Sequence, residues 1–336
     1  LVDSLENIDY SLCTLEFETR RESYYWLVDQ LHLWRAYVWE FGRLNITNTV
    51  MSKRKLKTLV ADGAVRGWDD PRMPTIKGLR RRGFTPEGIN AFCAAISASR
   101  TTETTIDWAR LEHFARLALD PVAPRAFAVL DPVKVVLTNR PAHFLEALHA
   151  PLFPKDPAKG ARELPYQREV FVDRRDVKAE DEPKFLGLAP GRIVSLRYAD
   201  VVHCDEVVCD EKGEVREVRC TVLGEEEKRA ALAHKDRKLG SIHWLAGAKV
   251  GEEPRRGEVR LYDHLFTTKN PAAEKDWKKS LNPTSEVVVP NAMLEASLLG
   301  RKAEDHVQFE RLGYFCVDKD SREDHIVYNR TCALHS

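Results

Sequence analysis

The feature that most constrains the fold of this chain is a succession of short strand-like runs from Val122 to the C-terminus. Runs such as Val133–Leu137 and Val215–Thr221 are rich in β-branched residues, and turn pairs such as Pro190-Gly191 separate them. Short strands with turns between them are typical of antiparallel barrels or sandwiches. We therefore expect a mainly β part after residue 121, with a helical piece near Ala272–Leu281. The acidic-basic run Glu225–Lys238 is expected to be a solvated hairpin loop.

The beginning of the chain has a different pattern. Ser11–Phe17 and Tyr37–Phe41 are strand-like, and the segment between them has apolar residues at three-four spacing. This spacing predicts an amphipathic helix. Its apolar positions are Tyr24, Leu27, Val28 and Leu31.

Residues 53–120 are expected to be helical. Apolar spacing predicts one helix over about Lys53–Ala61 and a short one over about Thr75–Arg82. Thr85 offers a capping hydroxyl, and Pro86 suits the first position of the next helix. Asp107 is a candidate cap for a further helix. A helical region therefore precedes the β part.

Composition excludes several classes of protein. The 336 residues contain 52 basic and 52 acidic side chains, so no global basic field would attract nucleic acid, and local basic patches would have to bind it. No run of about 18 apolar residues and no signal-peptide pattern is present. Seven scattered cysteines favour reduced thiols in the cytoplasm. A zinc site at His203, Cys204, Cys209 and Cys220 is disfavoured because no Cys-x-x-Cys pair occurs, so we expect no bound metal.

Residues 43–56 (RLNITNTVMSKRKL) carry the clearest chemical signal. Thr47, Asn48 and Thr49 are loop formers, and the following residues 53–57 crowd four cations into the first turns of a helix. A loop that carries a hydroxyl and an ammonium suits a site where polyphosphate charge grows during a reaction. On composition alone, a solvated basic helix start explains the stretch equally well.

A resemblance to a known family decides between these interpretations. Met51–Lys55 resembles the KMSKS loop of class I aminoacyl-tRNA synthetases, and its setting, Ser11–Phe17 and Gly67–Thr75, resembles glutaminyl-tRNA synthetases. The similarity extends from about residue 5 to about residue 334, nearly the whole chain. Long matching runs include Leu79–Gly83 and Gln308–Arg311.

The resemblance implies a mixed α and β fold. It places the end of a class I Rossmann-type core at residues 1–34 and a helical region with the KMSKS loop at 35–121. Two antiparallel β-barrels that grip the anticodon loop would occupy 122–336, with an uncertain boundary between them.

The family joins glutamine to ATP as an adenylate and then transfers the glutaminyl group to its tRNA. By resemblance, Ser52 and Lys53 would stabilise charge on the triphosphate as pyrophosphate leaves. The residues implied at ATP, which is accompanied by Mg in the full enzyme, are Thr14, Arg43, Leu44, Met51, Ser52 and Lys53. The HIGH-type half of the site and the glutamine pocket would lie upstream of residue 1. We therefore expect a C-terminal fragment that binds tRNA and is inactive alone.

The resemblance also implies residues that contact tRNA. Those expected at the anticodon are Arg125, Lys184, Arg197, Gln308 and Arg311, with Lys184 and Arg197 assigned to the second barrel. Glutamine offers a donor and an acceptor to one base edge, and arginine offers a planar fork.

Further tRNA contacts are expected in the helical region. Arg100 lies in a loop that touches tRNA in the family, and the cations of Arg80–Arg82 would meet phosphates. The chain departs from the family pattern at Phe185 and Ser195, where bacterial members carry arginine. We expect the outer anticodon bases to be read differently here, with Phe185 as a stacking surface.

Alternatives remain open. Eukaryotic and archaeal glutamyl-tRNA synthetases share the loop and both barrels, although Ser11–Phe17 and Tyr328–Thr331 favour the glutaminyl type. The chain could instead be a free-standing tRNA-binding module, or its barrels could form a platform for proteins, including other synthetases in a complex.

Overall fold

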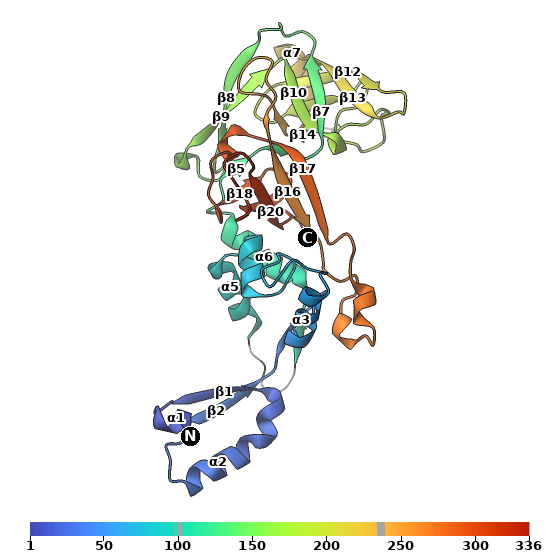
Figure 1. Ribbon diagram of the computed structural model, residues 1–336. Helices are drawn as coiled ribbons and strands as arrows, with labels where there is room; N and C mark the ends of the chain where they lie inside the picture. Colours follow the sequence, from blue (N-terminus) through green and yellow to red (C-terminus); the bar gives the residue numbers. More distant parts are fainter. Residues whose placement is uncertain (98, 100–102, 234–238, 336) are drawn as a thin grey trace.

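The computed structural model describes residues 1–97, 99, 103–233 and 239–335. The molecule is elongated (Figure 1). Strands β1 and β2 lie at one end with helix α2, a helical region follows, and two barrel-like sheets complete the other end. Arg100 and residues 234–238 lie outside the described residues.

The N-terminal end is a two-stranded parallel sheet of β1 (Tyr10–Thr14) and β2 (Tyr37–Phe41). The strand expected over Ser11–Phe17 ends earlier, because a 3₁₀ helix occupies Leu15–Arg20. Helices α1 (Val2–Leu5) and α2 (Arg21–Gln30) accompany the sheet. Of the apolar positions expected to face a core in α2, only Val28 is buried, while Leu27 remains exposed. The amphipathic stripe is therefore present in sequence but is largely uncovered.

The helical region has the two caps that the sequence predicts, Thr85 and Asp107, and a third cap at Thr75, which was expected inside the helix. The side chains of Thr75, Thr85 and Asp107 accept hydrogen bonds from backbone N–H groups at the first turns of α4, α5 and α6. Each cap satisfies a donor that has no partner within the helix. The elements of this region are β3 (Leu44–Ile46), α3 (Lys53–Ala61), α4 (Ile76–Arg82), α5 (Pro86–Ile96), β4 (Thr104–Ile106) and α6 (Trp108–Leu119).

The first barrel, which we name the outer barrel, contains seven strands in the order β14-β11-β12-β13-β7-β10-β15. Most neighbours are antiparallel, whereas β13–β7 and β11–β14 are parallel. Its strands are β7 (Pro132–Leu137), β10 (Glu169–Asp173), β11 (Ile193–Leu196), β12 (Val201–Cys209), β13 (Val215–Val222), β14 (Gly240–Ile242) and β15 (Trp244–Leu245). A separate hairpin of β8 (Leu145–Pro151) and β9 (Ala161–Gln167) packs beside it.

The second, inner barrel lies between the outer barrel and the helices (Figure 1). Its order is β5-β18-β19-β20-β16-β17-β6, so the chain enters it, leaves to build the outer barrel, and returns. Its strands are β5 (Arg125–Ala126), β6 (Ala128–Val129), β16 (Arg255–Tyr262), β17 (Glu286–Leu294), β18 (His306–Phe309), β19 (Gly313–Val317) and β20 (Val327–Cys332). The barrels are nested in sequence, which puts Lys184 and Arg197 in the part of the chain that forms the outer, first barrel.

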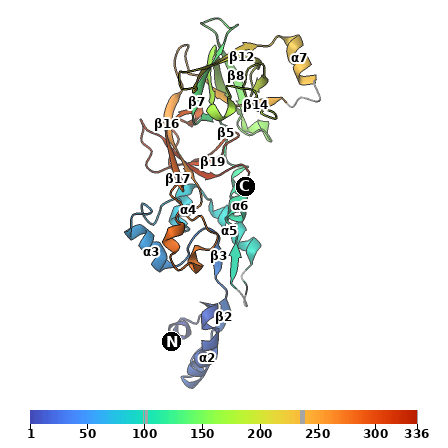
Figure 2. The same cartoon turned by 90° about the vertical axis from the view of Figure 1, so that its right-hand side faces the viewer.

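The run Glu225–Lys238 differs from the expected hairpin loop. Residues Glu225–Ala233 form helix α7, which projects from the outer barrel (Figure 2). Three glutamates in the first turn complement the helix dipole, and the following residues have high helix propensity. Local helix signals therefore outweigh the polar character that suggested a loop.

Candidate nucleic-acid interface

The KMSKS-like loop has a buried beginning and an exposed end. Val50 is 1% exposed, and Thr47 accepts a hydrogen bond from the backbone of Trp108 through its hydroxyl at 3.0 Å. Ser52 then occupies the N-cap of α3, and Lys53 is its first residue; both side chains are exposed. The hydroxyl and ammonium expected to act on a triphosphate are thus adjacent and open to solvent.

A segment of the inner barrel holds the base of this loop. The chain between β16 and β17 reaches the loop, where the backbone N–H of Asn48 donates to Lys269 at 2.9 Å. The Asn48 side chain donates to the carbonyls of Phe266 and Thr268 at 3.1 and 3.2 Å. Lys55 donates to the carbonyl of Ala272 at 2.9 Å. The KMSKS-like loop and the inner barrel are therefore in direct contact.

The other residues expected at ATP lie in the same end of the molecule. Thr14 ends β1, opposite Phe41 of β2. Arg43 follows β2 and donates to Glu16 at 2.8 Å. Leu44 begins β3, beside Thr104 of β4. Arg43 links β2, which pairs with the strand of Thr14, to β3, which begins at Leu44, and Met51 follows further along the chain before α3.

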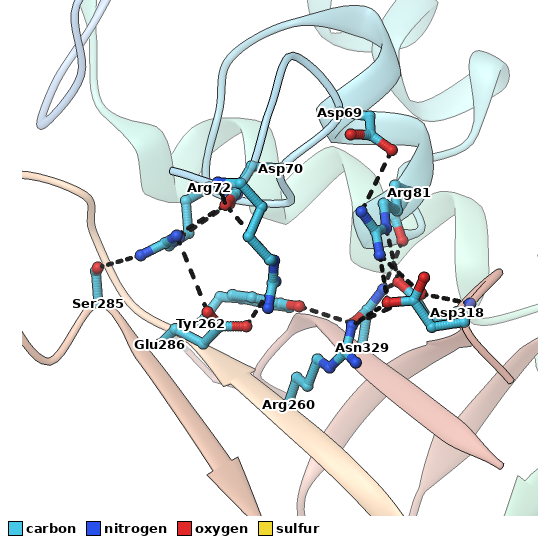
Figure 3. A network of polar contacts seen from close by, with 12 residues as sticks. Asp69, Asp70, Arg72, Arg81, Arg260, Tyr262, Ser285, Glu286, Asp318 and Asn329 are labelled. Carbon is cyan, nitrogen blue, oxygen red and sulfur yellow. Dashed lines mark hydrogen bonds and ion pairs between the residues drawn. The ribbon is translucent and has the colours of Figure 1, made fainter. Parts of the chain in front are cut away.

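Arg81 anchors α4 to the inner barrel. It donates to both carboxylate oxygens of Asp318, at 2.9 and 3.0 Å, and to Asp320 and Asp69 (Figure 3). Burial alone would raise the pKa of Asp318, but hydrogen bonds from Arg81, the Asp320 backbone and Asn329 lower it to about 2. Asp318 is therefore an ionised anchor at neutral pH.

A second ion pair continues this contact. Arg72 donates to Asp70 through Nε and Nη2, at 2.9 and 2.7 Å, and to Ser285 at 3.1 Å (Figure 3). Arg66 reaches Glu286 of β17 at 2.7 Å. The two networks fix the helical region on the inner barrel.

The three arginines of Arg80–Arg82, all expected to contact phosphates, lie in different environments. Arg82 is buried and donates to the carbonyl of Thr331 at 3.1 Å and to Glu112 at 3.3 Å. Arg81 forms an ion pair with Asp318. Arg80 is the exposed member, although it pairs with Glu304. The triplet therefore serves mainly to attach α4, which a basic run in sequence does not reveal.

At the junction of the barrels, Arg125 and Gln308 are direct neighbours. Strands β5 and β18 pair in parallel with Gln308 opposite Arg125. The Arg125 guanidinium is 8% exposed and donates to the carbonyls of Asp120 and Ala123, and to the Asp120 carboxylate. Among the described residues, the Gln308 side-chain amide has no hydrogen-bond partner. An amide with a free donor and acceptor can contact a base edge.

Arg311 crosses from the inner to the outer barrel. Its two terminal nitrogens donate to the two carboxylate oxygens of Asp176 at 2.6 and 2.7 Å, and one of them donates to Nδ1 of His243 at 2.9 Å. Burial, with the charge of Arg311, lowers the pKa of His243 to about 3. His243 is therefore neutral, and its Nε2 donates to the carbonyl of Ala128 at 2.9 Å.

Arg197 is held by a buried carboxylate between the barrels. Its Nε donates to Glu310 at 2.6 Å, and the Tyr198 hydroxyl donates to the same carboxylate at 3.1 Å. Arg162 of β9 donates to Glu310 at 2.7 Å and to Glu295 at 3.0 Å. Arg197 thus follows β11 of the outer barrel but is fixed by the residue that precedes Arg311.

The remaining predicted contacts, Lys184, Phe185 and Ser195, make none of the hydrogen bonds to Glu310, Asp176 or His243 described above. Lys184 is exposed and has a left-handed backbone, with φ of 67°. The half-buried Phe185 ring packs on Gly187, where a Cβ would come within 2.5 Å of the ring. Lys178 lies 4.9 Å from the ring centroid. Ser195 pairs with Val201 within the outer barrel.

Three residues of the junction were not anticipated from the sequence. Glu310, Asp176 and His243 bind the expected arginines, yet each comes from a different strand or turn. Glu310 alone carries a local signal, because it lies inside the matching run Gln308–Arg311. Partners contributed by distant segments have no such signal.

The described residues contain no cluster of three or more His, Cys, Asp or Glu suited to a metal ion. Cys204 and Cys220, considered above for zinc, are neighbours on β12 and β13 and are buried free thiols. Within the described ranges, no helix is long and apolar enough to cross a membrane.

Three family models match consecutive parts of the chain. The model described as tRNA synthetases class I (E and Q), catalytic domain, matches residues 1–121. Two models described as the anti-codon binding domain of the same synthetases match residues 123–223 and 241–318. These segments correspond to the N-terminal and helical parts, the outer barrel and much of the inner barrel.

Individual relatives agree with these models. The chain is 46% identical to the "Probable glutamine--tRNA ligase" of Dictyostelium discoideum and to the "Glutamine--tRNA ligase, cytoplasmic" of Arabidopsis thaliana, with 99% of this chain and 42% of each relative covered. It is 45% identical to the "Glutamine--tRNA ligase" of Vibrio vulnificus, with 59% of that protein covered. The chain thus spans about half the length of these relatives. The motif, the barrels and the matches together show that it belongs to the class I tRNA synthetases of the E and Q type.

Proposed function

We propose that this chain is the part of a glutamine–tRNA ligase that binds tRNA and recognises its anticodon. The proposal rests on the junction of the barrels, where Gln308 lies opposite Arg125 and has a free side-chain amide. At the same junction Arg197 is held by Glu310, and Arg311 is held by Asp176. RNA specificity depends on hydrogen bonds to the edges of splayed bases, with cations at the phosphates. This cluster offers both kinds of group from separate segments of the chain.

The junction supports different roles for its members. Gln308 would read one base edge through its donor and acceptor. Arg125 and Arg311, already bound to carboxylates, would supply positive charge in fixed positions. Lys184 would contact the phosphate backbone, and Phe185 would stack under a base. Arg100 is retained as a tRNA contact by resemblance alone.

For the whole protein we propose ATP-dependent attachment of glutamine to its tRNA. Lys53 and Ser52 would stabilise the triphosphate as pyrophosphate leaves, because their groups are adjacent and exposed at the start of α3. Thr14, Arg43, Leu44 and Met51 would hold ATP. A Mg ion bound with ATP would neutralise phosphate charge.

The domain limits 1–34, 35–121 and 122–336 are likewise proposals. The exposed apolar residues beside β1 and β2 support assignment of residues 1–34 to a larger core, because parallel sheets are normally covered on both faces. We propose a cytoplasmic location, by analogy with the Arabidopsis relative. Association with other synthetases is a further proposal without a specific surface.

Binding of glutamine tRNA to the 336-residue chain tests the proposed function. We expect binding that weakens as salt rises, because phosphate contacts release counterions. Gln308→Ala should weaken binding by roughly tenfold, the scale of one good base contact. His203→Ala, a change at a half-buried position on β12 of the outer barrel, is the control and should leave binding unchanged. Equal affinity for glutamate tRNA would favour the glutamyl alternative, and no tRNA binding would contradict the proposal.

A further inference from the structure

Glu310 is a buried carboxylate at the point where both barrels meet. Its side chain is 5% exposed and accepts hydrogen bonds from Arg162, Arg197 and Tyr198. Its backbone N–H donates to Ala126 of β5 at 3.0 Å. Both the position of the main chain and the direction of the carboxylate are therefore determined by the surrounding elements.

The contact with Arg197 has a specific geometry. Glu310 accepts from Nε of Arg197, and among the described residues it is the one carboxylate within ion-pair distance of that guanidinium. A guanidinium held through Nε keeps two terminal amino groups that can donate elsewhere. Arg197 is 36% exposed, whereas Arg162, on the opposite oxygen of Glu310, is 3% exposed. Arg162 is thus buried inside the network, and Arg197 lies at its edge.

We propose that Glu310 is a positioning residue that fixes the Arg197 guanidinium for recognition of the anticodon. The inference rests on the proposed function and adds a residue that would touch no RNA. It also explains how one base-reading surface is assembled from two barrels. Glu310 lies between Gln308 and Arg311 on the inner barrel, while Arg197 comes from the outer barrel.

Because Glu310 is charged, a single substitution can distinguish a role in positioning Arg197 from an effect on the general electrostatic attraction to RNA. Glu310→Gln removes a negative charge beside Arg197, so nonspecific attraction to phosphates should stay the same or increase. Loss of the Nε anchor should let Arg197 sample other rotamers and weaken its discrimination between bases. A purely structural role would predict similar losses of affinity for every tRNA.

Glu295 provides a matched control. It is also buried, with a side chain 1% exposed, and it accepts from the same Arg162. It also accepts from the backbone N–H of Phe127 at 2.8 Å. Glu295→Gln therefore weakens the same network between the barrels without removing a partner of Arg197.

The experiment measures affinities of the 336-residue chain for glutamine tRNA and for three versions with one anticodon base changed in each. We expect Arg197→Ala to reduce discrimination at one anticodon position by roughly tenfold. Glu310→Gln should reduce discrimination at the same anticodon position. The double variant should lose no more discrimination than either single variant. Glu295→Gln should retain discrimination.

The possible results separate the two proposals. Lack of discrimination by the unmodified chain would overturn the proposed function and, with it, this inference. Discrimination that survives Glu310→Gln, or that Glu295→Gln abolishes equally, would overturn the positioning role alone. If Glu310→Gln does not fold, Glu310→Asp keeps the charge but withdraws the carboxylate, and it should also lose discrimination at the Arg197 position.

Discussion

At the scale of single residues, the cations proposed to read the anticodon are held by carboxylates. Arg125 pairs with Asp120, Arg197 with Glu310 and Arg311 with Asp176. An arginine whose rotamer is already fixed loses less conformational entropy when it contacts RNA. The same pairing offsets part of its positive charge. These residues are therefore suited to geometric discrimination more than to general attraction.

His243 gives this arrangement a pH dependence. Its pKa of about 3 in the folded protein lies below the ordinary value near 6.5, because the ring is buried and lies beside the positive charge of Arg311. The unfolded chain therefore binds a proton that the folded chain does not, and stability falls as pH decreases from 6.5 toward 3.

We expect His243→Gln to reduce this dependence. Between pH 7 and pH 5, the unfolding free energy of the unmodified chain should fall by about 2 kcal/mol more than that of the variant. Urea unfolding at the two pH values measures the difference. The same pH slope in both proteins would mean that His243 is not a neutral partner of Arg311.

At the scale of elements, α4 is attached to the inner barrel chiefly through Arg81 and Asp318. Asp318 has a side chain with 0% exposure, and Arg81 contacts both of its oxygens. Because the folded pKa of Asp318 is about 2 and the ordinary value is about 3.9, its contribution is present above pH 4. It is lost as pH falls from about 4 through 2.

Asp318→Asn should leave Arg81 without its main buried partner. At pH 5 we expect a loss of roughly 3 kcal/mol in unfolding free energy, the usual scale for one broken buried pair. The difference in unfolding free energy between the unmodified chain and the variant should narrow by about 1 kcal/mol at pH 3, because the unmodified chain begins to lose the same interaction. Asp320→Asn, whose side chain is 44% exposed, is the control with a small expected effect. The same difference in unfolding free energy at pH 5 and pH 3 would contradict the assigned ionisation of Asp318.

The sequence predicts elements whose signals are local. The bounds of α3 and the caps Thr85 and Asp107 follow from spacing and side-chain chemistry within a few residues. The pairing of β5 with β18 joins Arg125 to Gln308 across the whole outer barrel, and no local pattern specifies it. For the same reason Asp176 and His243 could not be assigned to Arg311 in advance. The exposed side of α2 shows that an apolar stripe predicts a helix without identifying what covers it.

At the scale of the whole molecule, the inner barrel lies between the proposed ATP-binding end and the outer barrel (Figure 1). It contacts the helical region through Arg81 and the KMSKS-like loop through Asn48. It also supplies Gln308 and Arg311 at the junction with the outer barrel. The inner barrel thus touches both proposed sites.

We propose above that the junction of the barrels reads the anticodon. The most direct test compares the affinity of the 336-residue chain for glutamine tRNA with its affinity for the same tRNA changed only at the middle anticodon base. If the junction reads the anticodon, the base change should weaken binding by about tenfold or more, at both low and high salt. Equal affinities with a steep salt dependence would contradict it, and would show that basic surfaces alone hold the RNA.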